Sequence, residues 1–548
     1  MSAPLRGLFA ALLAALYAVV PCEPLAAQVS HAGHSAEAAP TVPQPPRLVT
    51  GHGSGGFPVR ATADAQPWFD QGMKLMHAYN LQESLKAFAE AQRRDPACAM
   101  CFWGEALALG PTVNYEMAPP AHAQAKAALA KAVALASAES SRNRALIEAL
   151  ALRYAFEGTE RGPAYRAYAE AMERLAREHQ GDGDLAVLAA DARMMTDRNW
   201  WERDGMTPRA GGAKALGLLE EVLKRNSSQT AAIHLYIHLT ERSARPELAE
   251  PYVGRLAALA PRASHLVHMA SHLYYRLGRY SEAKRVNRRA IAADEDYARR
   301  ARPEGGLGAM STFAHNAYFG MSAAILSGDT AAAGELSRYF LAAAPLGERT
   351  PGWTYPIYAM AYIASPPAAD AAPAVPAPFL KALWRYSRAA AKLSAPDGSG
   401  IEAEVQALES LLADPAAPKS GSHRITMELA ALELKARSAF SVGRYEEAAQ
   451  LFAGAADMQD SAPTLDPPLW WYPLRRSLAA AHLAAGRPQA AQAEIEKTLI
   501  KWRDDPVSLL ILARTQRALG RKSEASAAQK KAVRLWHGGP SLLRRPLI

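Results

Sequence analysis

The sequence predicts an all-α protein, an α-solenoid in which antiparallel helix pairs stack into a superhelix. Of the 548 residues, 49% are hydrophobic but only 8% are aromatic, and the alanine-rich balance favours helices. Alternating runs of Val, Ile and Thr joined by Asn-Gly or Asp-Gly turns, which indicate sheets, are missing. A Gly-Arg turn recurs along the chain, and such recurrence is the mark of a repeat architecture.

The overall charge limits the classes of partner. Lys and Arg number 62 against 53 Asp and Glu, so the net charge is 62 − 53 = +9. A moderate basic excess attracts acidic surfaces without requiring nucleic acid. No RNP, zinc-finger or homeodomain pattern is present. We therefore expect no nucleic-acid partner.

Residues 1–27 read as a secretory signal peptide. Arg6 precedes an apolar run from Leu8 to Val20, and Ala27 ends a plausible cleavage site. That run is too short to span a bilayer, and no later stretch reaches about 18 apolar residues, so we expect no integral membrane segment. Pro21 directly before Cys22 argues against a lipoprotein signal. The expectation is a secreted protein, most simply in a bacterial periplasm.

Residues 28–63 are rich in Ala, Pro, Gly and Ser, a composition typical of flexible segments. We expect a flexible leader here. His31, His34 and His52 lie within it and are interpreted as solvated linker residues.

A short motif then divides the rest of the chain into repeats. Gly-Arg-Tyr followed by Glu and Ala begins at Gly278 and at Gly443, and variants begin at Gly486 and Gly520. The interval between the last two glycines matches a repeat of about 34 residues whose two helices are joined by a turn of this kind.

The motif and its period resemble the tetratricopeptide repeat (TPR) superfamily. An N-terminal copy departs from the family pattern at Gln71 and Leu75. It matches the family's Trp, Gly, Phe, Ala and Pro positions with Trp68, Gly72, Phe88, Ala91 and Pro96. The resemblance implies small residues where the two helices of a pair approach. Alanines occupy these positions in several copies, namely Ala283, Ala290, Ala436, Ala448, Ala455, Ala479, Ala491, Ala513, Ala525 and Ala532.

The resemblance also implies a domain organisation and a binding mode. We expect an N-terminal TPR-like array over residues 64–363, a Pro/Ala linker over 364–378 that breaks the array, and a C-terminal TPR array over 379–548. Stacked pairs form a concave face lined by the first helix of each pair, and such faces bind peptides or protein segments. A protein or peptide in this groove is the default partner.

Histidines gather in the central repeats. Six of the 15 fall in the interval from His234 to His315. One repeat period separates His234 from His268, and the same period separates His238 from His272, so equivalent helix faces carry imidazoles. Spacings of three, four and seven residues place His234, His238 and Glu241 on one helical face, and His265, His268 and His272 on another.

This arrangement predicts a transition-metal site. Helix axes 8–10 Å apart let imidazoles from neighbouring helices share an ion. Imidazole with carboxylate suits Zn, Cu, Fe or Ni, whereas Ca and Mg need an oxygen shell. Cu, Fe or Zn is expected, without assignment among them. The candidate ligands, which the TPR phase places in the concave groove, are His234, His238, Glu241, His265, His268, His272 and His315.

Several interpretations of the cluster remain open. The simplest first shell is His234, His238, His268 and His272, with the other candidates as further ligands, ligands of a second ion, or supporting groups. The surplus favours a metal-dependent enzyme, either an oxidoreductase or a hydrolase. The absence of an acid, base or nucleophile motif outside the cluster favours binding alone. A metal-free, pH-sensitive scaffold and ordinary core packing are the remaining alternatives.

Two cysteines lie outside the signal peptide, Cys98 and Cys101. No histidine follows them, so the haem c attachment motif is absent. In an exported protein we expect a disulfide between them. Redox exchange remains an alternative, as does a Cu(I) site with Met73, Met76 and His77.

Basic runs at residues 276–302 and 514–545 would attract an acidic partner. Gly-rich phosphate loops, nucleophile elbows and His-Glu-x-x-His pairs are missing.

Overall fold

The computed structural model describes residues 47–539 apart from residues 115, 118, 304, 348–349, 367–376, 394–400 and 463–466. The predicted signal peptide and the start of the predicted leader lie outside the described residues. Within them the chain forms 23 α-helices and no β-strand, and a single isolated β-bridge joins Trp201 to Pro208.

The helices that precede the histidine block are α1 (Gln66–His77), α2 (Leu81–Arg94), α3 (Ala99–Ala108), α4 (Pro119–Leu135), α5 (Ser141–Arg153), α6 (Gly162–Glu178), α7 (Gly183–Met194) and α8 (Ala210–Arg225). The central helices are α9 (Thr230–Glu241), α10 (Glu250–Leu259), α11 (Ser264–Arg276), α12 (Tyr280–Ala301), α13 (Ser311–Leu326), α14 (Thr330–Ala343) and α15 (Tyr355–Ala364). The C-terminal helices are α16 (Pro378–Lys392), α17 (Ile401–Ala413), α18 (Gly421–Ser441), α19 (Tyr445–Ser461), α20 (Leu474–Ala484), α21 (Pro488–Lys501), α22 (Pro506–Ala518) and α23 (Lys522–Leu535).

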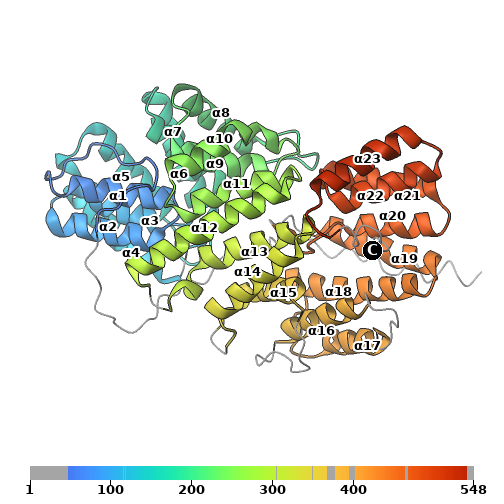
Figure 1. Ribbon diagram of the computed structural model, residues 1–548. Coiled ribbons are helices and arrows are strands. Elements are labelled where there is room, and N and C mark those ends of the chain that lie inside the picture. Colours follow the sequence, from blue (N-terminus) through green and yellow to red (C-terminus); the bar gives the residue numbers. More distant parts are fainter. Residues whose placement is uncertain are drawn as a thin grey trace, which may run out of the picture.

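Each helix packs against the next one in the sequence. The most extensive contacts join α11 to α12, α12 to α13, α22 to α23, α18 to α19, and α1 to α2. Figure 1 shows these helices stacked from α1 (blue) through α11 (green) to α23 (red). The chain is an all-α, TPR-like α-solenoid, as the sequence predicts.

The turns within five helix pairs share one backbone geometry. Gly278 has φ 73°, and its neighbour Arg279 donates its N–H to the carbonyl of Tyr274 at 2.7 Å. The same left-handed glycine and the same reach-back bond recur at Gly328, Gly443, Gly486 and Gly520. Glycine adopts this conformation without steric cost, which explains why the motif begins with it.

The α1–α2 turn has the same geometry without the glycine. Tyr79 holds the left-handed position with φ 56°, and Asn80 donates its N–H to the carbonyl of Leu75 at 2.9 Å. A bulky L-residue is unusual at positive φ. This turn is therefore an exception within the repeat pattern.

Two sequence predictions need correction. Residues 47–63 do not form a flexible leader: His52 and Phe57 are buried, and the Ser54 N–H donates to Thr230 Oγ1 at 2.9 Å. The linker does not divide the array into two blocks either. The helices on its two sides, α15 and α16, pack together, and Ile357 and Phe379 belong to one continuous hydrophobic cluster.

Candidate metal centre

Three consecutive first helices, α9, α11 and α13, carry the six histidines of the block. Every residue of α9 is buried. A helix that is apolar around most of its circumference requires neighbours on all sides, and α9 packs against α8, α10 and α11. Polar side chains on such a helix are held inside the protein, where they must find partners.

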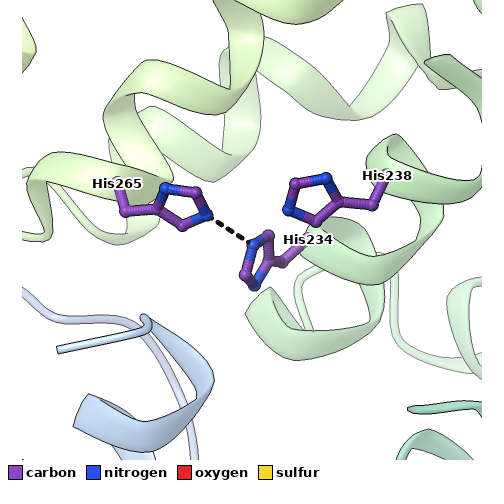
Figure 2. Close-up of side chains that lie close together, drawn as sticks. All are labelled: His234, His238 and His265. Atoms are coloured by element: carbon purple, nitrogen blue, oxygen red, sulfur yellow. Dashed lines mark hydrogen bonds between the residues drawn. The ribbon is translucent and has the colours of Figure 1, made fainter. Parts of the chain in front are cut away.

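The six histidines form two groups of three. Figure 2 shows His234 and His238 on α9 pointing toward His265 on the neighbouring helix. The second group joins His268 and His272 of α11 to His315 of α13. In each group, one nitrogen from every ring lies within 4.8 Å of the other two. Each triad therefore combines an i, i+4 pair from one helix with one residue from the next helix.

The spacing of the nitrogens suits a shared ion. His234 Nε2 lies 2.9 Å from His265 Nε2, His268 Nε2 lies 2.9 Å from His272 Nε2, and His315 Nε2 lies 3.0 Å from His268 Nε2. Nitrogens that bind one ion at about 2.0–2.1 Å stand roughly 2.9–3.4 Å apart for right-angled to tetrahedral geometry. The printed distances of the second triad, and the His234–His265 distance of the first, fall in or near this range.

In four of the rings, the Nδ1 atom contacts a hydrogen-bond acceptor. His234 Nδ1 lies 2.8 Å from the carbonyl of His77, and His238 Nδ1 lies 3.2 Å from Glu241 Oε1. His268 Nδ1 lies 2.6 Å from Asn287 Oδ1, and His272 Nδ1 lies 2.9 Å from Glu241 Oε2. Metal-bound histidines show this pattern, in which a carbonyl or carboxylate orients the ring from behind.

One contact fixes a tautomer in the second triad. Asn287 Nδ2 donates to the carbonyl of Ala283 at 2.8 Å, so its Oδ1 must accept a proton from His268 Nδ1. His268 Nε2 then carries a lone pair. This atom lies 2.9 Å from His272 Nε2 and 3.0 Å from His315 Nε2, where the other two rings of the triad converge.

Glu241 lies behind the rings, in contact with both triads. Its oxygens contact the Nδ1 atoms of His238 and His272, so the structure places it as an orienting group and not among the converging Nε2 atoms. Burial raises the pKa of the Glu241 carboxyl, but contact with His272 and His238 outweighs burial and holds it well below the ordinary value. A carboxylate at the C-terminus of a helix is unfavourable by itself, and these two imidazoles offset that cost.

Five of the six imidazoles are buried and His315 is half-buried, so most of the cluster does not line an open groove, contrary to the sequence prediction. His268 is fully buried, and His234, His238, His265 and His272 are at most 5% exposed. Burial lowers the pKa of His234, His265 and His268 well below the ordinary value, and neighbouring imidazoles lower it further. A lowered pKa favours the neutral form of these three rings, which metal ligation requires.

Sequence reasoning missed Tyr79. Its ring lies against the whole first triad, with centroids 4.5 Å from His234, 5.2 Å from His265 and 6.2 Å from His238. Tyr79 and His234 lie in distant parts of the sequence, so no helical spacing connects them. Its left-handed φ at a glycine position is the one local signal, and only the backbone shows it.

Three tyrosines on the same helices, Tyr236 on α9 and Tyr274 and Tyr275 on α11, form other contacts. The Tyr236 hydroxyl donates to Glu220, and Tyr275 pairs with Ser322. Tyr274 packs under the guanidinium of Arg279. None of the three phenols contacts a triad through these bonds.

Cys98 and Cys101 form a disulfide at the start of α3. The bond removes the two thiolates that the alternative Cu(I) site with Met73, Met76 and His77 would need. His77 contributes to the histidine centre instead, through its backbone carbonyl.

The first predicted basic run is partly neutralised. Lys284 pairs with Asp329, Arg288 with Glu335, and Arg279 with both Glu250 and Glu282. Exposed pairs of this kind add little stability, but they reduce the attraction of this face for an acidic partner.

The fold and the site together define a class: a TPR-like α-solenoid with a buried histidine centre. No family model matches the chain, and no curated protein matches its sequence. Among solved structures, the chain is similar to the APC/C hetero-tetramer Cut9-Hcn1 (13% identity, 88% of this chain and 76% of that chain covered, TM-score 0.30). It is also similar to the human IFIT1 dimer with m7Gppp-AAAA (13%, 87% and 91%, TM-score 0.33) and to yeast Tom70 (12%, 86% and 90%, TM-score 0.27). The helix pairs of the chain itself, more than these likenesses, define its fold.

Proposed function

We propose that the chain holds two transition-metal ions in one buried centre, each bound by the Nε2 atoms of one histidine triad. The observation that carries this proposal is the convergence, twice over, of one nitrogen from each of three imidazoles within 4.8 Å of one another. The triads adjoin, with ring centroids 5.9 Å apart for His238 and His272 and 6.1 Å for His265 and His268.

The donor set favours copper. Imidazole ligands supply no negative charge, and Glu241 is the one carboxylate in contact with the triads in the hydrogen bonds and ion pairs of the described residues. Burying uncompensated charge is costly, so ions of low charge are preferred. Cu(I) brings a single charge, whereas Zn(II) or Fe(II) would need an added anion such as hydroxide. Imidazole suits all three metals, and iron and zinc are the other outcomes of the test.

The coordination favours catalysis over a purely structural role. Structural sites close their shell with four protein ligands, whereas catalytic sites keep a position open for water or substrate. Three nitrogens per ion leave such a position in each triad. We therefore propose a metal-dependent enzyme, an oxidoreductase if the metal is copper or iron and a hydrolase if it is zinc.

Export to an oxidising compartment remains part of the proposal. The signal peptide that predicts it lies outside the described residues. The disulfide between Cys98 and Cys101 supports it, because such bonds persist in oxidising compartments. Among the described residues, no helix is long and apolar enough to cross a membrane.

Protein or peptide binding by the solenoid is the second candidate, and it rests on the stacked helix pairs alone. The burial of the histidines separates it from the metal centre, because a ligand in an open groove would not reach the rings. The two functions are compatible.

Elemental analysis tests the metal proposal. The full chain, purified and then loaded with copper, should hold close to two ions, one per triad. The double change His234→Ala with His272→Ala removes one ligand from each triad and should abolish stoichiometric binding, whereas His272→Ala alone should leave about one ion. His423→Ala, a histidine stacked on Phe379 outside the cluster, is the matched control. Unchanged metal content in the double variant would refute the proposal.

A further inference from the structure

A cavity of about 400 Å³ opens beside the start of α9. It lies between the N-terminal segment at residues 54–56, the start of α7 and the end of α8. Ser54, Gly181 and Asn226 on its lining are exposed, so the cavity communicates with solvent. Its lining also includes His77 and Ala231.

A second, much smaller cavity of about 20 Å³ lies deeper in the protein. It shares His77 and Ala231 with the outer cavity, and its lining also includes Tyr79 and His234. About 10–15 Å³ is enough for one water molecule. The two cavities therefore follow one another from the surface to His234 of the first triad. His77 lies between them and lines both.

We propose that this sequence of cavities is the entry passage of the metal centre, which admits transition-metal cations and ligands of a few atoms. The inference rests on the proposed function, because a passage to the triads has a role only if they bind an ion. The rings of the first triad, on α9 and α11, are at most 4% exposed, and the inner cavity is lined by one of them, His234.

The lining of the passage suits a cation. Asp184 contributes a carboxylate, which accepts a hydrogen bond from Gln229 Nε2 at 2.9 Å. Gln229 Oε1 is buried and has no hydrogen-bond partner among the described residues. His77 lines both cavities and adds an imidazole to their polar groups. Arg225 on the outer lining lies 3.5 Å from Glu221, which partly offsets its charge. Arg153 lines the inner cavity together with the carboxyl group of Asp191.

The small inner cavity also limits what can pass. A space for about one water molecule admits an ion only after it has shed most of its hydration shell. Oxygen and nitrogen donors along the outer cavity replace that shell stepwise. The same constriction excludes peptides and other bulky molecules from the triads.

Opposite changes at the two ends of the passage test the proposal. At Gly183 an added Cβ meets only Gln229 and Val222, each at 3.7 Å, so Gly183→Trp fills the outer cavity without a backbone clash. Gly162→Trp is the control, because Gly162 also begins a helix and its Cβ would meet only Arg166 at 3.4 Å. His77→Ala widens the junction and keeps the backbone carbonyl that contacts His234.

The measurement is the rate at which the metal-free full chain takes up Co²⁺ alone, followed by stopped-flow absorbance, with the final metal content determined separately. We expect Gly183→Trp to slow uptake at least about tenfold, His77→Ala to accelerate it, and Gly162→Trp to leave it unchanged, all with wild-type final content. Wild-type rates in both passage variants would overturn the inference. If Gly183→Trp fails to fold, His77→Ala decides the test by itself: Co²⁺ uptake no faster than in the wild type would overturn the inference. Absence of metal from the wild-type chain would instead refute the proposed function.

Discussion

Replacing Glu241 with glutamine should impair one of the two triads. Glu241 is 5% exposed, and its two oxygens accept from the Nδ1 atoms of His238 and His272 at 3.2 and 2.9 Å. Glutamine has the same shape but only one acceptor oxygen, and its amide nitrogen cannot accept a proton. One imidazole must then place its proton on Nε2, where it blocks the lone pair that would bind the ion.

The size of the effect follows from the number of lost contacts. Removing a group that orients a metal ligand typically weakens metal binding 10- to 100-fold, or about 1.4–2.8 kcal/mol. Only one of the two imidazoles loses its acceptor, so one site should weaken by this factor while the other keeps most of its affinity. The loss of the negative charge adds a smaller penalty at both sites, because each ion then has one countercharge fewer.

Titration of the metal-free protein with copper, followed by calorimetry, measures this difference. The wild type should show two strong sites, and Glu241→Gln one strong and one weakened site. Glu433→Gln is the matched control, because Glu433 is also fully buried and accepts a hydrogen bond from Tyr472, but it lies on α18, away from the centre. Two sites of wild-type affinity in Glu241→Gln would refute the orienting role.

Two further predictions concern stability. Burial raises the pKa of Asp191 to about 6, above its unfolded value of about 3.8, so its ionised form destabilises the fold. That cost is absent below pH 3.8 and reaches about 3 kcal/mol above pH 6. Between pH 4 and 7.5, the free energy of unfolding of Asp191→Asn should therefore rise by about this amount relative to the wild type, as measured by denaturant unfolding. Changing both Cys98 and Cys101 to serine should lower the free energy of unfolding by about 2 kcal/mol, as expected for a short disulfide loop. Elemental analysis should show the same metal content as in the wild type. Loss of copper would instead support the alternative Cu(I) site at these cysteines.

The helical repeat could be predicted because it is a local property. Each helix pair carries its own signals: the left-handed glycine, as at Gly443 and Gly520, and the small residues where its helices meet, as at Ala448 and Ala525. The regular repeat period placed the histidines on equivalent faces of consecutive helices for the same reason. No contact between distant segments was needed for this step.

The grouping of the histidines could not be predicted because it depends on helix packing. The sequence favoured a first shell of His234, His238, His268 and His272, whereas the structure divides this set between two triads. Helix α11 contributes to both, since His265, one turn before His268, contacts the triad on α9. Spacing along a helix gives the face of each side chain, but the stagger between helices decides which rings meet.

The burial of the centre has a non-local cause as well. A concave groove would leave the rings open, yet the end of α1 covers them, with Tyr79 on the first triad and the His77 carbonyl on His234. The segment before α1 is tied to α9 through Ser54 and Thr230. These contacts join segments that are several repeats apart in the sequence. They cannot be predicted from the pattern of any single repeat.

Tyr79 belongs to the segment that packs over the first triad, and its backbone conformation points to a functional role. Five other pairs place glycine at the same turn position, and a residue with a Cβ costs about 1–2 kcal/mol in the left-handed conformation. Stability of the turn alone would favour glycine here too. Backbone strain of this kind persists where the surrounding structure holds it in place, and it concentrates at functional sites. At this turn the ring lies against three histidines, so the strained residue is the one whose side chain encloses the proposed metal centre.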